Sequence, residues 1–490
     1  MGTLVGAANE GGQYVDMVYG QLDAARQSIS KLVAEIETLR QQLEQVKLEL
    51  RLERQNKFLT GQAKRGAADE GCAAEGIQGE PGAAAPRKRG APLGHPGWFR
   101  PTPTEFDLLI DVAAPETCPH CGGEVNCFSD AGRREHMQED VVDGVYQVVL
   151  YRHPMARCRS CRRWVQQPGE GELLHSRIGP RLRALALFLR NDIGVSYRKV
   201  PRTLRELFDF PFTPAALIGF EKLLAEQAKP LVDDIARKIA SSDGPVNADE
   251  TYWSLNGERA YYWLHATEEY VHFQFDTSRA GEVSRQVLGE HFAGTLVTDC
   301  YAAYDAQVAK AKQKCQAHLA RTARDWLKLT TVGSTAHQFF ADVKDFVKRG
   351  CEFHRRRRAA GHLPAEEQEA VKTWLRSELA RLASCPVDHD KAVTLRQRIV
   401  KYYDEWLVFL DDPRVPPTNN LAERELRPLV VLRKITFGHR TEAGAHRMAR
   451  IMTVQQTAKR HGHKATDIFY RLLTQPPDRV LKHLYAGGER

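Results

Sequence analysis

Apolar residues recur every seven positions near the start of the chain, at Val15, Leu22, Ile29, Ile36, Leu43 and Leu50. A second apolar series, at Val18, Ala25, Leu32, Leu39 and Val46, lies three residues after the first. Two series at this spacing form a narrow seam, which is typical of a coiled coil, whereas a helix packed on its own protein body carries a broader apolar stripe. We therefore predict a coiled coil over residues 15–57 that joins two copies of the chain in a homodimer.

The heptad pattern stops before residues 61–104, where Gly, Ala and Pro dominate and the basic tract PRKRGAPLGHPGWFRP appears. This composition is typical of a flexible basic linker. The pattern of residues 105–165 predicts short strands around two Cys-x-x-Cys pairs. Residues 173–243 then have helical periodicity. Within that helical region, SYRKVPRTLRELFDF and TPAALIGFEKLLAEQ flank a short turn. The pair is compatible with a helix-turn-helix DNA-binding domain, and equally with any other helical hairpin.

Residues 245–319 change to strand periodicity, with the aromatic and β-branched runs PVNADETYWSL, RAYYWLHAT and YVHFQFD. Asn256-Gly257 between the first two runs is a hairpin signal. A helix near 280–289, a strand GTLVTD, a helix over 301–311 and a short strand around KCQAH should follow. This order predicts a mixed sheet covered by helices.

The segment 320–412 is rich in Arg, Glu, Leu and Ala and nearly lacks strand signals, so it reads as an all-helical insertion. Residues 413–473 should then return the chain to the sheet domain, and residues 474–490 form a C-terminal tail. The predicted fold class is therefore multidomain α+β: a coiled coil, a zinc-binding domain, a helical domain, and a mixed-sheet domain interrupted by helices.

Composition places the chain among ordinary soluble proteins, with 490 residues of which 42% are hydrophobic and 27% charged. No apolar run approaches the roughly 18 residues needed to span a bilayer, and no signal peptide is evident, so we expect a cytoplasmic protein with no membrane partner. The net charge of +8 is unevenly spread, because residues 419–461 hold nine Lys and Arg against three acids. Such a patch suits a polyanion such as nucleic acid, with a solvated charged face as the alternative.

Four cysteines fall in two Cys-x-x-Cys pairs, Cys118 with Cys121 and Cys158 with Cys161. Two such pairs brought together by strands supply four thiolates to a structural Zn²⁺ ion in tetrahedral arrangement. The 36-residue gap between the pairs is longer than the usual spacing, and redox-active or incidental cysteines are the alternatives.

Three acids are candidates for a metal-dependent site. Asp249 closes the run PVNAD and Asp299 closes GTLVTD, so neighbouring strands would bring two carboxylates to one place where they repel unless a cation separates them. Glu423 in PTNNLAERELRP has two readings: it completes a capping box with Asn420 as the N-cap, or it supplies a third ligand. Three acids would suit two Mg²⁺ or Mn²⁺ ions and in-line attack on a phosphodiester.

Cys315 and His318, in CQAHLARTARDW, are placed by the pattern at the fifth strand. A Cys-x-x-His pair could bind zinc, but no second pair of suitable spacing stands nearby. There are two other interpretations: the two residues form a buried structural pair, or the histidine contacts the scissile phosphate.

The motifs NADET, TDCYAAYD, CQAHLAR and NNLAERELRP…LRKITFG occur in this order, and the chain resembles transposases of the insertion sequence 66 family along most of its length. The resemblance implies a ribonuclease-H-like core whose Asp-Asp-Glu triad is Asp249, Asp299 and Glu423. It also implies a secondary site at Cys315 and His318. The residues implied to contact DNA phosphates are Arg424, Arg427, Arg433 and Lys434. The sequence departs from the family pattern at Thr418, Cys300 and Gln316, none of which is a triad position.

On this resemblance we expect a bacterial, nucleoid-associated DNA transposase. It would bind the terminal inverted repeats of its element, cut them with two divalent metal ions, and join the 3′ ends to target DNA, with accessory proteins of the same element as further partners. Two alternatives are a nuclease on the same core that lacks strand transfer, and a dimeric zinc-ribbon DNA-binding regulator. Metal dependence distinguishes them, because a regulator binds DNA without magnesium and makes no nicks.

Overall fold

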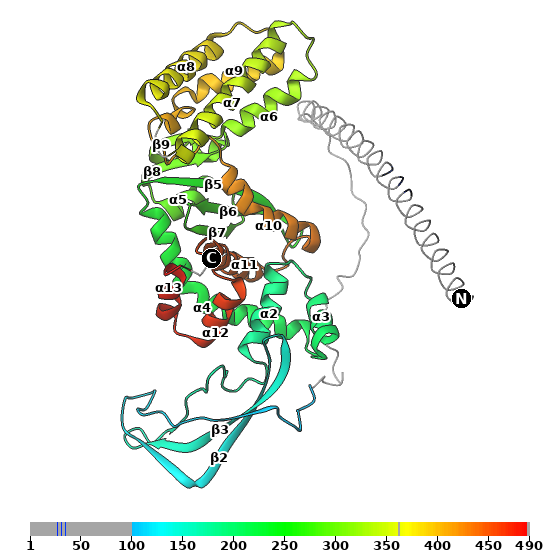
Figure 1. The fold of residues 1–490 in the computed structure, drawn as a ribbon, viewed down its shortest axis with the longest axis vertical. Coiled ribbons are helices and arrows are strands. Elements are labelled where there is room, and N and C mark those ends of the chain that lie inside the picture. The colour runs from blue at the N-terminus through cyan, green and yellow to red at the C-terminus, as the bar shows by residue number, and fades with distance from the viewer. Residues whose placement is uncertain (1–26, 28–30, 32–34, 36–99, 361–362, 488–490) are drawn as a thin grey trace, which may run out of the picture. The chain divides into compact units, whose positions relative to one another are not determined.

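A computed structural model of the protein describes residues 100–360 and 363–487 together with Gln27, Lys31 and Glu35 (Figure 1). The chain divides into two compact units, Met1–Pro96 and Gly97–Arg490. The coiled coil predicted over 15–57 and most of the predicted linker lie outside the described residues, although the three described positions in the coiled-coil segment are helical and exposed. No helix in the described part of the chain is long and apolar enough to cross a membrane.

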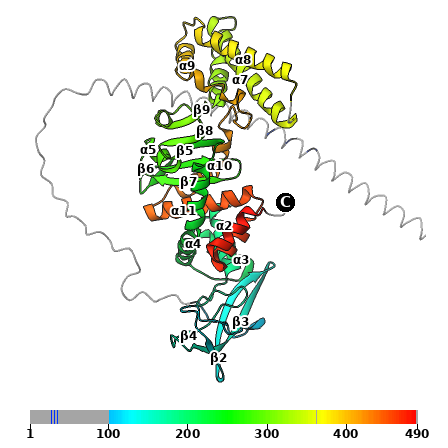
Figure 2. The same ribbon diagram turned by 90° about the vertical axis from the view of Figure 1, so that its left-hand side faces the viewer.

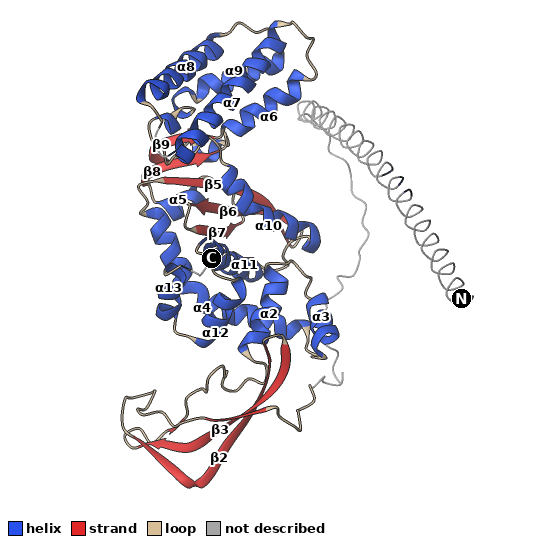
Figure 3. Ribbon diagram, in the orientation of Figure 1, coloured by secondary structure: helices blue, strands red, loops and turns tan. Residues whose placement is uncertain are grey.

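The first sheet is dominated by a long hairpin of β2 (Val125–Val142) and β3 (Val145–Cys158), drawn in red in Figure 3. Asp143 and Gly144 form its turn with φ of 51° and 81°, as a two-residue hairpin turn with left-handed central residues requires. The short strands β1 (Leu108–Asp111) and β4 (Trp164–Val165) also pair with β3. The short strands predicted for this region are thus wrong for β2 and β3, which gain length because they pair with each other on both sides of an irregularity between Phe128 and Arg133.

Three helices follow, α2 (Pro180–Asn191), α3 (Lys199–Phe208) and α4 (Pro214–Ala240), within the region predicted to be helical. Their apolar faces share a core with α12 (Ala465–Thr474) and α13 (Pro477–Tyr485). The C-terminal residues predicted as a tail therefore include a helix whose Val480 and Leu484 are fully buried.

The second sheet has the strand order β7-β6-β5-β8-β9, which Figure 2 displays from the side. Its strands are β5 (Pro245–Leu255), β6 (Glu258–Ala266), β7 (Val271–Asp276), β8 (His291–Thr298) and β9 (Val308–Lys314). The strands β5, β8 and β9 run parallel, and β6 and β7 are antiparallel to their neighbours. Asn256 and Gly257, with φ of 52° and 93°, form the predicted hairpin turn between β5 and β6.

Helices cover both faces of this sheet. The helices α10 (Asn420–Thr436) and α11 (Glu442–Arg460) pack with Trp253, Tyr262 and Leu264. The opposite face, represented by Val246 and Leu296, belongs to the core that contains α4 and α5 (Glu282–Leu288). Because side chains alternate along a strand, every second residue of β5 faces α10.

The predicted helical insertion lies between β9 and α10 and has a core of its own. Its helices are α6 (Gln316–Leu327), α7 (Thr335–Ala360), α8 (Ala365–Ser384) and α9 (Asp390–Lys401), followed by the short 3-10 turns Tyr403–Glu405 and Val408–Leu410. The helix predicted over 301–311 is wrong: only Ala302–Tyr304 makes one 3-10 turn, and β9 begins at Val308. Pairing with β8 overrides the helical propensity of its Ala, Lys and Gln residues.

Candidate active site and metal sites

Asp249 and Asp299 occupy matching positions on two neighbouring parallel strands. Asn247 of β5 pairs with Val297 of β8, and each aspartate follows its paired residue by two positions. Residues two apart point to the same face of a sheet, so both carboxylates lie on the face covered by α10. The predicted strand end at Asp299 is confirmed, but Asp249 does not close β5, because pairing with β6 continues that strand to Leu255.

One oxygen of each aspartate is fixed by the backbone. Asp249 Oδ1 accepts the N–H of Glu250 at 2.8 Å, and Asp299 Oδ1 accepts the N–H of Tyr301 at 2.8 Å. Burial raises the pKa of the Asp249 carboxyl to about 8, and the negative charges of Glu250, Asp299 and Glu423 add to the effect. Carboxylates that repel one another at this strength favour a bound cation.

Glu423 lies on the first turns of α10, whose N-cap is Asn419 rather than Asn420. The capping-box reading of Glu423 is therefore wrong, since Glu423 is the fourth helical residue and no side chain caps this helix. The Glu423 carboxylate instead lies 3.8 Å from His318 Nε2 and 3.6 Å from Arg321 Nη2, both on α6. The acid thus faces the first helix of the insertion at ion-pair distance, while its Oε1 is buried without a hydrogen-bond partner among the described residues.

Asn419 connects the elements that carry the three acids. Its side-chain amide donates to the Ala248 carbonyl at 2.8 Å, and its side-chain oxygen accepts from the Asn247 amide at 2.8 Å. Its backbone N–H donates to Cys315 Sγ at 3.0 Å. With 1% of its surface exposed, Asn419 joins β5, α6 and α10 at a single point. The paired asparagines stood out in the sequence, but only the fold reveals which one is buried.

Cys315 and His318 do not lie on the fifth strand, because β9 ends at Lys314 and Cys315 is the N-cap of α6. Atoms of Cys315, His318 and Glu423 that could bind a metal lie within 4.8 Å of one another. The Asp249, Asp299 and Glu423 oxygens are not gathered into so tight a group within the described residues. Burial raises the pKa of the Cys315 thiol to about 11, so this sulfur is protonated at neutral pH.

Glu250 is a fourth acid that the sequence pattern did not single out. Alternation along β5 directs it to the opposite face from Asp249. Arg279 donates to its Oε1 from both Nε and Nη2, at 3.0 and 2.7 Å, and the Tyr304 hydroxyl donates to its Oε2 at 2.8 Å. These three donors occupy Glu250 and leave Asp249 as the free carboxylate of this strand.

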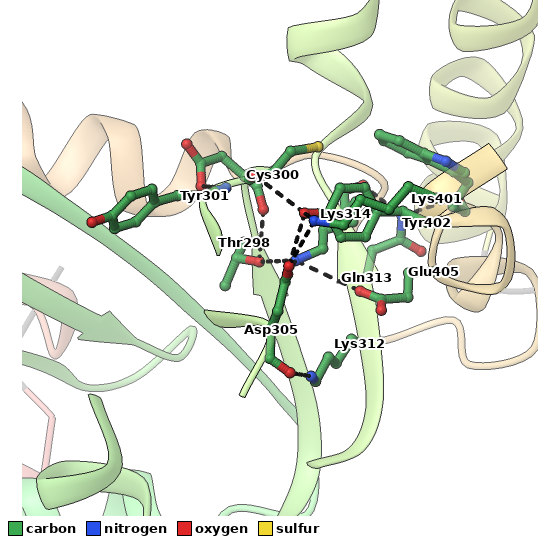
Figure 4. A network of polar contacts seen from close by, with 12 residues as sticks. Thr298, Cys300, Tyr301, Asp305, Lys312, Gln313, Lys314, Lys401, Tyr402 and Glu405 are labelled. Atoms are coloured by element: carbon green, nitrogen blue, oxygen red, sulfur yellow. Dashed lines mark hydrogen bonds and ion pairs between the residues drawn. The ribbon is translucent and has the colours of Figure 1, made fainter. Parts of the chain in front are cut away.

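The loop after Asp299 is held by a buried lysine (Figure 4). Lys314, at the end of β9, is fully buried, with Nζ 3.5 Å from Asp305 Oδ1 and 3.6 Å from Glu405 Oε2. Lys401 donates to the other oxygen of Asp305 at 2.9 Å, and the Tyr402 hydroxyl donates to the Cys300 carbonyl at 3.4 Å. The insertion therefore anchors the loop that follows Asp299. No sequence signal distinguished Lys314 from the other lysines of β9.

The four predicted zinc ligands come together at one end of the β2–β3 sheet. The Cys118–Cys161 and Cys121–Cys158 sulfur pairs are 3.6 and 3.5 Å apart, and all four sulfurs lie within 4.8 Å of one another. Four thiolates around zinc at about 2.3 Å would be separated by such distances, whereas a disulfide requires about 2.05 Å. A backbone N–H from Cys161 lowers the pKa of the Cys158 thiol to about 6, which favours the thiolate. The cluster is compatible with zinc.

The four basic residues implied to contact DNA lie along α10, but they are not equivalent. Arg424, Arg427 and Lys434 are exposed. Arg433 donates to Thr251 Oγ1 at 3.2 Å and to the Tyr252 carbonyl, so its guanidinium is tied to β5. The three exposed residues are the better placed to meet a polyanion.

Comparisons with known proteins extend these observations. A family model described as "Transposase IS66 family" matches residues 175–447. The chain is 24% identical over 422 residues to the uncharacterized protein y4qI of Sinorhizobium fredii, covering 76% of this chain and 72% of that protein. It is 23% identical over 441 residues to the uncharacterized protein y4hP of the same organism, covering 79% and 76% of the two chains.

Proposed function

The chain belongs to the IS66 family of transposases, and from this membership we propose that it cuts the ends of a mobile DNA element and joins the freed 3′ ends to target DNA. Membership establishes an enzyme that acts on DNA and uses divalent metal. The observation that carries the finer proposal is the matched register of Asp249 and Asp299 beneath the helix of Glu423. The mixed sheet supports a ribonuclease-H-like core for this Asp-Asp-Glu site.

The residues present fit Mg²⁺ or Mn²⁺. Asp249 is held near other carboxylates with no basic partner of its own among the described residues, and burial first, then the repulsion of these carboxylates, raises its pKa, which a bound cation would oppose. Asp249 and Asp299 each keep one oxygen free of the backbone bonds described above, and carboxylate oxygens are the ligands that hard cations prefer. Bound metal would supply an activated nucleophile and stabilise the leaving oxygen.

The protein's own residues orient the site. Asn419 fixes the start of α10 on β5, and thereby sets the distance from Glu423 to Asp249. His318 and Arg321 face the Glu423 carboxylate at ion-pair distance from the side of α6. Arg321, half exposed, also presents a guanidinium suited to a DNA phosphate beside these acids.

The remaining parts of the chain bind DNA and assemble the protein in this proposal. Cys118, Cys121, Cys158 and Cys161 hold a structural Zn²⁺ ion, and the zinc-binding and helical domains bind the terminal inverted repeats. Arg424, Arg427 and Lys434 contact phosphates, and the coiled coil over 15–57 pairs two copies. Accessory proteins of the element and a location on the bacterial nucleoid belong to the same proposal.

The test is a cutting and joining assay with purified protein, magnesium or manganese, and end-labelled DNA that carries the inverted repeats flanking the gene. We expect cuts at the repeat boundary and transfer of labelled ends to a plasmid. Glu423→Gln should bind the same DNA without cutting, while Glu442→Gln, an exposed acid on α11, should retain activity.

Two outcomes would overturn the proposal. Cutting without joining, even with neighbouring gene products added, would identify a nuclease on this core. If the wild type, Glu423→Gln and Glu442→Gln all bind the DNA without cutting it under the same conditions, the protein is a DNA-binding regulator.

A further inference from the structure

A basic cavity lies apart from the three acids. It has a volume of about 540 Å³ and is enclosed by the loop between α2 and α3, by α4, and by the loop that joins α10 to α11. Four arginines line it, Arg190, Arg198, Arg440 and Arg447. No acidic side chain lines it within the described part of the chain. This concentration of positive charge indicates an anionic ligand.

Arg190 is the clearest sign that the cavity takes a ligand. Only 1% of its surface is exposed, yet its Nε and Nη1 have no hydrogen-bond partner among the described residues. The nearby carboxylate of Glu221 lies 3.9 Å from Nε, beyond hydrogen-bond range, and accepts the Tyr197 hydroxyl at 2.6 Å instead. Buried guanidinium donors are normally satisfied, and although the Arg190 guanidinium lies 4.2 Å from the centre of the Tyr197 ring, these two N–H donors of a residue in the cavity wall remain open to an acceptor.

Further donors converge on the same space. Nε of Arg447 is also buried without a partner. Thr441, in the cavity wall, is the N-cap of the 19-residue helix α11, and its side chain accepts the Gly444 N–H; the N-terminal end of such a helix attracts anions. His439 Nδ1 accepts the indole N–H of Trp253 at 2.9 Å, which places the ring proton of the neutral imidazole on Nε2. The cavity thus combines guanidinium and imidazole donors with the N-terminal end of a helix.

We propose that this cavity binds a phosphate group, with Arg190 and Arg447 as its principal contacts. Planar guanidinium forks and a helix N-terminus match the tetrahedral, acceptor-rich oxygens of phosphate. The volume is large enough to admit more than the phosphate alone, so a nucleotide unit can enter.

An exposed aromatic residue next to the cavity wall in sequence favours a DNA strand as the source of that phosphate. Phe437, next to the lining residue Gly438, is 82% exposed and has a left-handed φ of 60°, which is unusual for an aromatic residue. An exposed ring beside a phosphate site can stack on an unpaired base. Lys199 and Arg202 of α3 are exposed and follow Arg198 in the wall, so they could continue the path of a strand. This choice of source rests on the proposed function, whereas the phosphate site itself does not.

The test measures binding without magnesium, so that cutting does not contribute. Titration calorimetry of the full chain with inorganic phosphate, deoxyadenosine monophosphate and a short single-stranded oligodeoxynucleotide should give saturable binding of each. Arg447→Gln should weaken the binding of phosphate and of the mononucleotide about tenfold or more. Arg450→Gln, on the same helix but paired with Glu226 and outside this cavity, is the matched control and should bind as the wild type does.

Two further variants separate the outcomes. Arg190→Lys keeps the charge but loses the fork, and should weaken phosphate binding while the melting temperature shows that the protein is folded. Phe437→Ala should weaken the binding of the mononucleotide and the oligonucleotide but not of inorganic phosphate. If Phe437→Ala binds all three ligands as the wild type does, DNA is rejected as the source of the phosphate while the phosphate site stands. Unchanged phosphate affinity in Arg447→Gln and Arg190→Lys would overturn the site, whether or not the protein cuts DNA. Phosphate binding in a protein that never cuts would instead reject the proposed function alone.

Discussion

The side-chain amide of Asn419 donates to the carbonyl of Ala248 at 2.8 Å, directly before Asp249 in β5. The two residues are 171 positions apart, and the whole helical insertion lies between them. One buried amide therefore sets how the helix of Glu423 meets the strand of Asp249, which is why a site assembled from such distant segments can be rigid.

We expect Asn419→Ala to lower the free energy of unfolding by about 1–3 kcal/mol, because it removes two side-chain hydrogen bonds and leaves the Asn247 and Ala248 groups buried without partners. DNA cutting should fall more than DNA binding, since α10 is no longer fixed on β5. Urea unfolding and the cutting assay measure the two effects. Asn420→Ala, next in sequence and exposed, is the control and should alter neither. Equal behaviour of the two variants would contradict the role given to Asn419.

Asp249 should make the magnesium-free protein less stable as the pH rises. Its carboxyl has a pKa of about 8 in the folded protein and ionises near pH 4 in the unfolded chain. Between these values the folded state keeps a proton that the unfolded state has lost, so the free energy of unfolding falls with increasing pH. Asp249→Asn removes this penalty, so its free energy of unfolding should exceed that of the wild type by roughly 2–4 kcal/mol near pH 8 but by little near pH 4.

Urea unfolding at several pH values without added magnesium measures this difference in the free energy of unfolding. Both proteins carry the same cysteine cluster, so its own response to pH cancels in the comparison. Asp325→Asn, an exposed aspartate on α6, should follow the wild-type curve at every pH. A stability difference between Asp249→Asn and the wild type that does not change with pH would show that the folded protein does not raise the pKa of Asp249.

Local patterns predicted the parts of the fold whose signals are short-range. The Asn256-Gly257 turn, the helices α3 and α4, and the convergence of two Cys-x-x-Cys pairs all followed from spacing or turn chemistry within a few residues. The helix expected over 301–311 failed because Val308–Lys314 contains good helix formers, and only its neighbour β8 makes it a strand.

Long-range contacts explain what the sequence could not supply at the candidate site. Which asparagine of the Asn419-Asn420 pair is the cap, and where its side chain goes, depends on Ala248, which is far away in the chain. Burial of Lys314 depends on Asp305 and Glu405, which reach it from a loop and from the insertion. Glu250, the acid next to Asp249, was missed because alternation alone does not say that Arg279 lies opposite.

The cysteine cluster predicts one zinc ion for each chain. Cys158→Ser should remove it, since three thiolates hold zinc less tightly than four. The β2–β3 domain should then become more susceptible to proteolysis, because loss of a structural metal removes the folding free energy that its binding supplies. Metal analysis of the purified protein gives the stoichiometry. Cys127→Ser, an exposed cysteine on β2 outside the cluster, should keep its zinc. Zinc retained in Cys158→Ser would exclude this assignment.

Lys314 should matter to the site although it touches none of the three acids. Lys314→Met leaves Asp305 and Glu405 facing each other without the buried ammonium that separates them, so we expect a loss of about 1–3 kcal/mol in the free energy of unfolding. The loop after Asp299 is anchored through Asp305 and Cys300, and cutting should therefore require a higher magnesium concentration than in the wild type. Lys310→Met, an exposed residue of the same strand, controls for the lost charge. If both lysine variants cut with the wild-type magnesium dependence, the contacts of Lys314 with Asp305 and Glu405 stabilise the helical insertion but do not position Asp299.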